Sequence, residues 1–75
     1  MIDTNARPLS PREHEVIQLA ARGLRNSQVA EELHVSVHAV KFHLASAYRK
    51  LGVANRTQAA VAYLSLANSL QKEES

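Results

Sequence analysis

Residues 26–52 have the sequence NSQVAEELHVSVHAVKFHLASAYRKLG, and this stretch decides the fold. Apolar side chains recur at helical spacing on both sides of a short hinge, residues 33–36. Those sharing one face of the shorter helix are Val29, Ala30 and Leu33, and those of the longer helix are Val40, Leu44, Ala47 and Leu51. Val35 can fill the hinge, and the Ser36 hydroxyl can cap the second helix. Since both stripes must face one core, the pattern predicts two helices packed at a steep angle.

A capping box precedes this pair and predicts another helix. Ser10, Pro11 and Glu13 are the N-cap, the first helical residue and the acceptor three residues after the cap. The helix should run from about Pro11 to Arg22, and Gly23 suits the left-handed residue that follows such a helix. The side chains expected in the core are Val16, Ile17, Ala20 and Leu24, with Leu19 as a further candidate.

The hinge and the chain end complete the set of helices. Asn26 is expected to cap the helix at residues 27–33, and His34 occupies a hinge position where a positive φ is common. The helix at residues 37–51 should end at Gly52, after which Val53 returns to the core.

A last helix should begin at the capping pattern of residues 55–58 and end near Leu70. No strand pattern is present in the sequence. The fold class expected is therefore all-α, a four-helix bundle that contains a helix-turn-helix.

Length and composition predict one domain whose core comes from helix packing alone. Residues 1–8 are expected to form a flexible leader, residues 9–70 the domain, and residues 71–75 a frayed tail. There is no cysteine, which excludes disulfides and thiolate metal sites. The longest apolar run, residues 59–64, is far too short to cross a membrane, and no basic and apolar signal segment begins the chain. We therefore expect a cytoplasmic protein.

Charge is distributed unevenly along the chain, although the formal net charge is only +2. Residues 33–72 contain five basic side chains and no acidic one, namely Lys41, Arg49, Lys50, Arg56 and Lys72. A positive region without carboxylates suits a polyanion such as DNA, because each carboxylate would repel phosphate. Chance is the alternative explanation for so few charges.

One face of the helix at residues 37–51 is predicted to enter the major groove. A rotation of about 100° per residue places the following side chains away from Val40: His38, Lys41, Phe42, Ala45 and Arg49. Lys41 and His38 can hydrogen-bond to base edges, and Ala45 permits close approach. Phe42 can contact a thymine methyl group or the sugar wall, or it can instead cover the edge of its own helix.

Phosphate contacts are expected from helix N-termini and from nearby polar side chains. The candidates are Ser27, Ser36, Arg49 and Lys50. For Lys50, and for Arg25 beside the second helix, an ordinary solvated charge is an equally good interpretation.

Four histidines raise the possibility of a metal site or an enzyme, which we do not expect. His34 and His38 are four residues apart, but the hinge separates them, so they do not share a regular helix face. His43 flanks the core stripe, where a histidine is more often structural than a ligand. We predict no catalytic residue, no metal and no cofactor.

Many of these positions together resemble the LuxR/FixJ-type, GerE-like transcription-factor domain. The matching motifs are Leu9-Ser10-Pro11-Arg12-Glu13, Glu15-Val16, Gly23-Leu24, Val29-Ala30, Val40-Lys41, His43, Arg49-Lys50-Leu51-Gly52-Val53 and Arg56-Thr57, which extend the resemblance over about residues 8–67. The resemblance implies a DNA-binding domain of bacterial regulators, with the third helix in the major groove and the fourth as a dimer surface.

Carried over by position, the base-reading sites of that family fall on Lys41, Phe42 and Ala45, and the backbone contacts fall on Ser36, Val37 and Ala39. Ala39 replaces a frequent threonine, Ala45 replaces a longer polar residue, and His34 replaces glycine or asparagine. The base preference therefore cannot be copied from a relative. The family often carries this domain in a longer chain, so a free-standing regulator and an excised output domain both fit. Neither a ligand pocket nor a phosphoacceptor is expected within these residues.

The fourth helix is apolar on most of its surface, which suggests a protein contact in addition to the core. Ala59, Tyr63 and Leu66 are expected to serve the core, and Val61, Leu64 and Ser65 to form a self-complementary patch of a homodimer. Contact with RNA polymerase is a further possibility. The rival hypothesis is a protein-binding module or anti-regulator that uses this helix and does not contact DNA.

Overall fold

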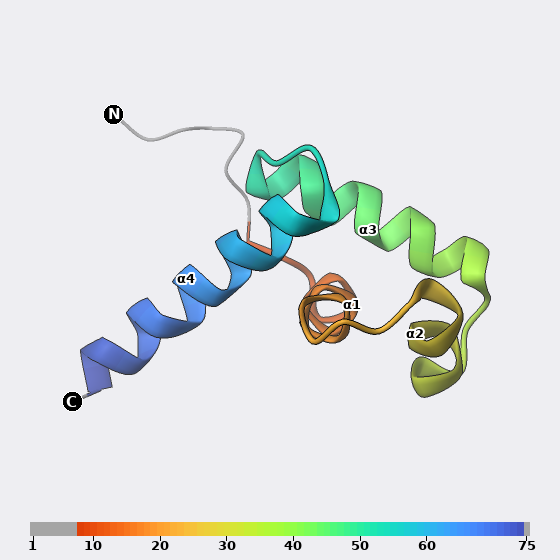
Figure 1. The fold of residues 1–75 in the computed structure, drawn as a ribbon, viewed down its shortest axis with the longest axis horizontal. Coiled ribbons are helices and arrows are strands. Elements are labelled where there is room, and N and C mark those ends of the chain that lie inside the picture. The colour runs from red at the N-terminus through yellow and green to blue at the C-terminus, as the bar shows by residue number, and fades with distance from the viewer. Residues whose placement is uncertain (1–7, 75) are drawn as a thin grey trace.

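The computed structural model describes residues 8–74, and their side chains as far as residue 66. This part of the chain contains four helices: α1 Pro11–Ala21, α2 Asn26–Leu33, α3 Val37–Leu51 and α4 Arg56–Glu74 (Figure 1). α1 and α3 each contact all three of the other helices, whereas α2 and α4 do not contact each other appreciably. The predicted all-α fold is confirmed for the described residues. The predicted leader lies outside them, apart from Pro8.

The first three helices end with the same turn. Each is followed by a residue in the left-handed conformation: Gly23 (φ 96°), His34 (φ 58°) and Gly52 (φ 71°). The next residue is apolar in each case, and its N–H donates to a carbonyl five residues earlier, at 3.2 Å for Leu24, 3.0 Å for Val35 and 3.0 Å for Val53. All three apolar residues pack against the core. This is the Schellman arrangement, which closes a helix and turns the chain back.

Local capping begins α1, α3 and α4 as the sequence predicts. Ser10 Oγ accepts from the Glu13 N–H at 3.1 Å, and Glu13 Oε1 accepts from the Ser10 N–H at 2.9 Å. Ser36 Oγ accepts from the Ala39 N–H at 3.0 Å. At the start of α4, Asn55 Oδ1 accepts from the Gln58 N–H at 2.9 Å. Each bond satisfies one of the amides that a helix N-terminus leaves without a helical partner.

Two helix boundaries differ from the prediction. The N-cap of α2 is Arg25 (φ −75°, ψ 161°), and Asn26 is the first helical residue. The Arg25 N–H donates to Gln28 Oε1 at 2.8 Å, whereas the Asn26 side chain accepts a hydrogen bond from Arg56. α4 continues to Glu74, past the predicted end near Leu70.

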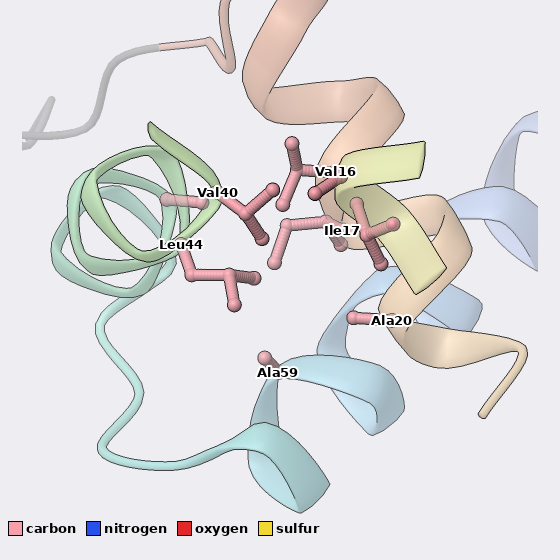
Figure 2. Packing of buried hydrophobic residues seen from close by; sticks show 9 residues of the cluster. Val16, Ile17, Ala20, Val40, Leu44 and Ala59 are labelled. Carbon is pink, nitrogen blue, oxygen red and sulfur yellow. The ribbon is translucent and has the colours of Figure 1, made fainter. Parts of the chain in front are cut away.

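The core lies where the four helices meet, and Figure 2 shows side chains of α1, α3 and α4 that point into it. Its buried apolar residues are Val16, Ile17, Ala20, Val29, Ala30, Val40, Leu44, Ala47 and Ala59. Val40 and Ala47 of α3 are fully buried, and Ala59 brings α4 onto the same cluster. Burial of a valine side chain contributes about 1.5–3 kcal/mol. Because α3 contributes one whole stripe to this core, its opposite side faces away from the core.

Candidate nucleic-acid interface

The outward side of α3 carries the residues that the sequence assigned to base reading. His38, Lys41, Phe42 and Ala45 are all exposed, and the side chain of Phe42 is 64% exposed. Figure 1 shows α3 along one edge of the molecule, with the other helices on its inner side. The predicted division of α3 into a buried and an exposed side is therefore confirmed. The Phe42 ring lies edge to face against the His43 ring of the same helix, with ring centroids 5.5 Å apart.

The hinge places the candidate phosphate contacts around the start of α3. Ser27 near the start of α2, Ser36 and Val37 are exposed. Ala39 is half-buried, and its N–H already donates to Ser36 Oγ. The Ala39 N–H is therefore part of the cap of α3, next to the exposed residues Ser36 and Val37.

Lys50 is half-buried and paired within the domain, which the sequence analysis did not predict. Its Nζ lies 2.8 Å from Glu13 Oε1 and 3.5 Å from the carbonyl oxygen of Pro8, and its side chain is 25% exposed. The Glu13 carboxylate offsets the charge of this ammonium, which leaves Lys50 less available to a phosphate than an unpaired cation would be. Arg49, the preceding residue, is exposed.

Glu13 joins the start of α1 to the end of α3. Its side chain is 7% exposed and accepts hydrogen bonds from Lys50, from the Ser46 hydroxyl and from the Ser10 N–H. Burial raises the pKa of this carboxyl, but the hydrogen bonds from Lys50, Ser46 and Ser10, with the attraction of the Lys50 charge, outweigh burial and lower the pKa to about 2. Sequence analysis recognised Glu13 only as a helix cap, because its other partners are distant in the sequence.

Arg56 also has a structural partner that the sequence did not reveal. Its guanidinium donates to the Leu24 carbonyl oxygen at 2.8 Å and to Asn26 Oδ1, which ties the start of α4 to the chain before and within α2. Of the described cations after the hinge, only Lys41 and Arg49 are exposed, since Lys50 and Arg56 are half-buried. The exposed positive surface is therefore smaller than the count of basic residues in the sequence predicted.

α4 presents apolar side chains on its outer side. Val61 is 64% exposed, Leu64 is 53% exposed, and Ser65 beside them is also exposed. Tyr63 is half-buried, and its ring meets the His14 ring of α1 edge to face at 5.1 Å. Leu66 was expected in the core but is 46% exposed, because the helix projects beyond the other three there (Figure 1).

Two further properties of the described residues concern metal binding and membrane insertion. Within residues 8–66, no three side chains of the metal-binding types His, Cys, Asp and Glu are grouped so that they could hold an ion. In the described part of the chain, none of the helices has the length and apolar character needed to span a membrane.

Comparison with known proteins identifies the family of this chain. Residues 7–63 match the family described as bacterial regulatory proteins, luxR family. Transcriptional activator protein BjaR1 of Bradyrhizobium diazoefficiens is 47% identical over 51 residues, which are 68% of this chain and 21% of that protein. The HTH-type transcriptional regulator MalT is 43% identical in Vibrio campbellii over 72% of this chain, and 44% identical in Yersinia pestis over 69%.

The chain spans only 6% of the length of either MalT protein. The similarity therefore concerns one part of these regulators. The family match, residues 7–63, includes the whole of α1, α2 and α3 and the beginning of α4.

Proposed function

Because the chain belongs to the luxR family of bacterial regulatory proteins, we propose that it binds double-stranded DNA sequence-specifically with α3 in the major groove. The observation that carries this proposal is the exposed side of α3. Lys41 and Arg49 are exposed there, and α3 contains no carboxylate. A groove lined by phosphates attracts such a surface, and an α-helix fits the width of the major groove.

The proposed roles follow from the position of each side chain. His38, Lys41, Phe42 and Ala45 contact base edges, since they project from the exposed side of α3. Ser27, Ser36, Val37, Ala39 and Arg49 are near the helix starts or the end of α3 and contact the DNA backbone. Phosphate contacts fix the position on the duplex, and base contacts select the sequence.

The fourth helix supplies the proposed dimer surface. Val61, Leu64 and Ser65 are spaced three and four residues apart, so they share one side of α4, and all three are exposed. A twofold dimer built on this stripe would place two copies of α3 on half-sites about one helical turn apart.

A gel-shift titration at 50 and 200 mM salt tests DNA binding. A protein that makes six or more phosphate contacts should lose about a thousandfold in affinity over this range. Arg49→Ala should weaken binding. Arg12→Ala, which removes the same charge, is the matched control. It should not weaken binding, because Arg12 is paired with Glu15 on α1 at 3.3 Å. If no duplex is bound, or if binding is independent of salt, the protein-binding alternative takes its place.

Sedimentation equilibrium tests the dimer with two variants of one helix. Leu64→Asp should abolish self-association, because Leu64 belongs to the proposed stripe. Leu66→Asp should leave it intact, since Leu66 has similar exposure but projects from another side of α4. Monomeric wild-type protein, both free and on DNA, would contradict the proposed dimer.

The cellular location of the whole regulator and one further partner are proposed on the same basis. A protein that binds chromosomal DNA acts in the bacterial cytoplasm, and RNA polymerase bound at a neighbouring promoter is the proposed additional partner. Fractionation of cells followed by immunoblotting tests the location. Co-purification with RNA polymerase, with and without the DNA site, tests the partner.

A further inference from the structure

Arg56 occupies a position that is unfavourable for a cation. It is the first residue of α4, where the free N–H groups of a helix carry a partial positive charge, and it is half-buried. Its guanidinium therefore needs acceptors that compensate for the repulsion and for the lost water. It has two: the Leu24 carbonyl oxygen, 2.8 Å from Nη1, and Asn26 Oδ1, which accepts from Nη2. One acceptor lies just before α2, and the other lies in its first residue.

These bonds join two helices that do not pack against each other. α2 and α4 each pack against α1 and α3, but they do not pack together within the described part of the chain. The Arg56 guanidinium spans the distance between them. Its N–H donors form a planar fork that can hold two acceptors at once, which the compact ammonium of a lysine does not match.

The first turn of α2 depends on this link, because the core does not reach it. Within residues 25–28, Asn26 is half-buried and the other three residues are exposed. The core contacts of α2 begin at Val29. The bond between Arg56 and Asn26 therefore fixes this turn against the rest of the domain. The next residue along the chain is Ser27, a proposed contact to the DNA backbone.

The placement of Ser27 is therefore set in part from α4. We propose that Arg56 is a positioning residue for DNA binding, which holds the first turn of α2 so that Ser27 meets a phosphate of the duplex. Arg56 acts through Ser27 and does not itself contact DNA in this role. A contact whose orientation is fixed before binding loses less freedom when the complex forms. The inference rests on the proposed function, because it requires Ser27 to lie against the DNA backbone.

A double-mutant cycle between Arg56 and Ser27 tests the proposal. A duplex of about two helical turns is selected by the wild-type protein from a random pool, and fluorescence anisotropy measures its affinity. Ser27→Ala should weaken binding about tenfold, as expected for one hydrogen bond to a charged group. Arg56→Lys keeps the positive charge but not the fork, and it should weaken binding by a similar factor. The double variant should bind no more weakly than either single variant, because both changes remove the same contact.

Two further variants separate positioning from a general loosening of α4. Asn26→Ala removes one acceptor of the guanidinium without changing the charge, and it should reproduce the loss seen in Arg56→Lys. Combined with Ser27→Ala, it provides the same cycle if Arg56→Lys does not fold. His14→Ala removes a different contact of α4, the edge-to-face pair with Tyr63, and should bind DNA as tightly as the wild type. A similar loss in His14→Ala would assign the effect to α4 as a whole and refute the proposal.

Each other outcome overturns a defined step. Wild-type affinity of Arg56→Lys and Asn26→Ala would refute the positioning role and leave DNA binding intact. Additive losses, about a hundredfold in the double variant, would show that Arg56 acts independently of Ser27 and so refute the proposal. Wild-type affinity of Ser27→Ala would refute it as well. Failure of the random pool to yield any bound duplex would refute the proposed function itself.

Discussion

The two sides of α3 differ in almost every physical property, although their residues alternate in the sequence. Val40, Leu44 and Ala47 are buried against the other helices, whereas Lys41 and Phe42 are exposed. Near the end of the helix two neighbouring cations also differ: Arg49 is exposed, whereas Lys50 is paired with a buried carboxylate. Folding and binding should therefore respond to different residues of one helix. Substitutions on the two sides test this separation.

The largest effect is expected on the buried side. Val40→Asp should unfold the domain, because Val40 is fully buried and an unpaired carboxylate there has no compensating partner. The expected cost is at least about 3–5 kcal/mol, a large part of the stability of a small domain. Circular dichroism should show the loss of the cooperative thermal transition. Ala45→Asp, on the exposed side of the same helix, should keep that transition, and unfolding of both variants would contradict the separation.

The next effect concerns the ion pair that anchors the end of α3. The pKa of Glu13 is lowered to about 2 in the fold from an ordinary value of 4.5. The folded state therefore favours the ionised carboxylate, and this stabilisation is complete above pH 4.5 and is lost as the pH falls towards 2. At pH 3 the loss relative to pH 7 should be about 2 kcal/mol.

Urea unfolding at pH 7 and pH 3 measures this loss. Glu13→Gln should be less stable than the wild type at pH 7 and should lose less on acidification, because its side chain does not titrate. The difference between the two proteins isolates Glu13 from the other carboxyl groups. Equal pH dependence of both would contradict the lowered pKa.

On the exposed side, Lys41→Ala should weaken binding without weakening the fold. The expected loss on a selected duplex is about 1–3 kcal/mol if Lys41 contacts a base edge. The free energy of unfolding should stay within about 0.5 kcal/mol of the wild-type value, as for most surface substitutions. Fluorescence anisotropy and urea unfolding measure the two quantities. Similar losses in both would mean that Lys41 supports the core.

The smallest effect separates the neighbouring cations. Arg49→Ala should reduce the slope of log affinity against log salt concentration by about one, because one phosphate contact is lost. Lys50→Ala should leave that slope unchanged and instead lower stability, since it leaves the buried Glu13 carboxylate without its cation. A reduced slope for Lys50→Ala would restore its expected role as a phosphate contact.

Local signals in the sequence were sufficient to predict most of the helices. The Ser10 and Ser36 caps and the turns at Gly23, His34 and Gly52 depend on residues within one or two helical turns, so the sequence pattern contains them. The buried and exposed sides of α3 follow from the helical period for the same reason.

Long-range partners could not be predicted in this way. Glu13 has the pattern of a helix cap, yet it also binds Ser46 and Lys50, which only the packing of α1 against α3 brings near it. The Asn26 side chain serves Arg56 instead of capping α2, because the start of α4 lies beside it. These contacts depend on the relative placement of helices, which no local pattern specifies.

The most direct test is an NMR titration of the isotope-labelled protein with a selected duplex. If α3 binds the major groove, the largest amide shift changes should occur at His38, Lys41, Phe42 and Ala45, with small changes at the core residues Val16 and Ile17. Largest changes confined to Val61 and Leu64 of α4, with α3 unchanged, would show that α3 is not the surface that contacts DNA.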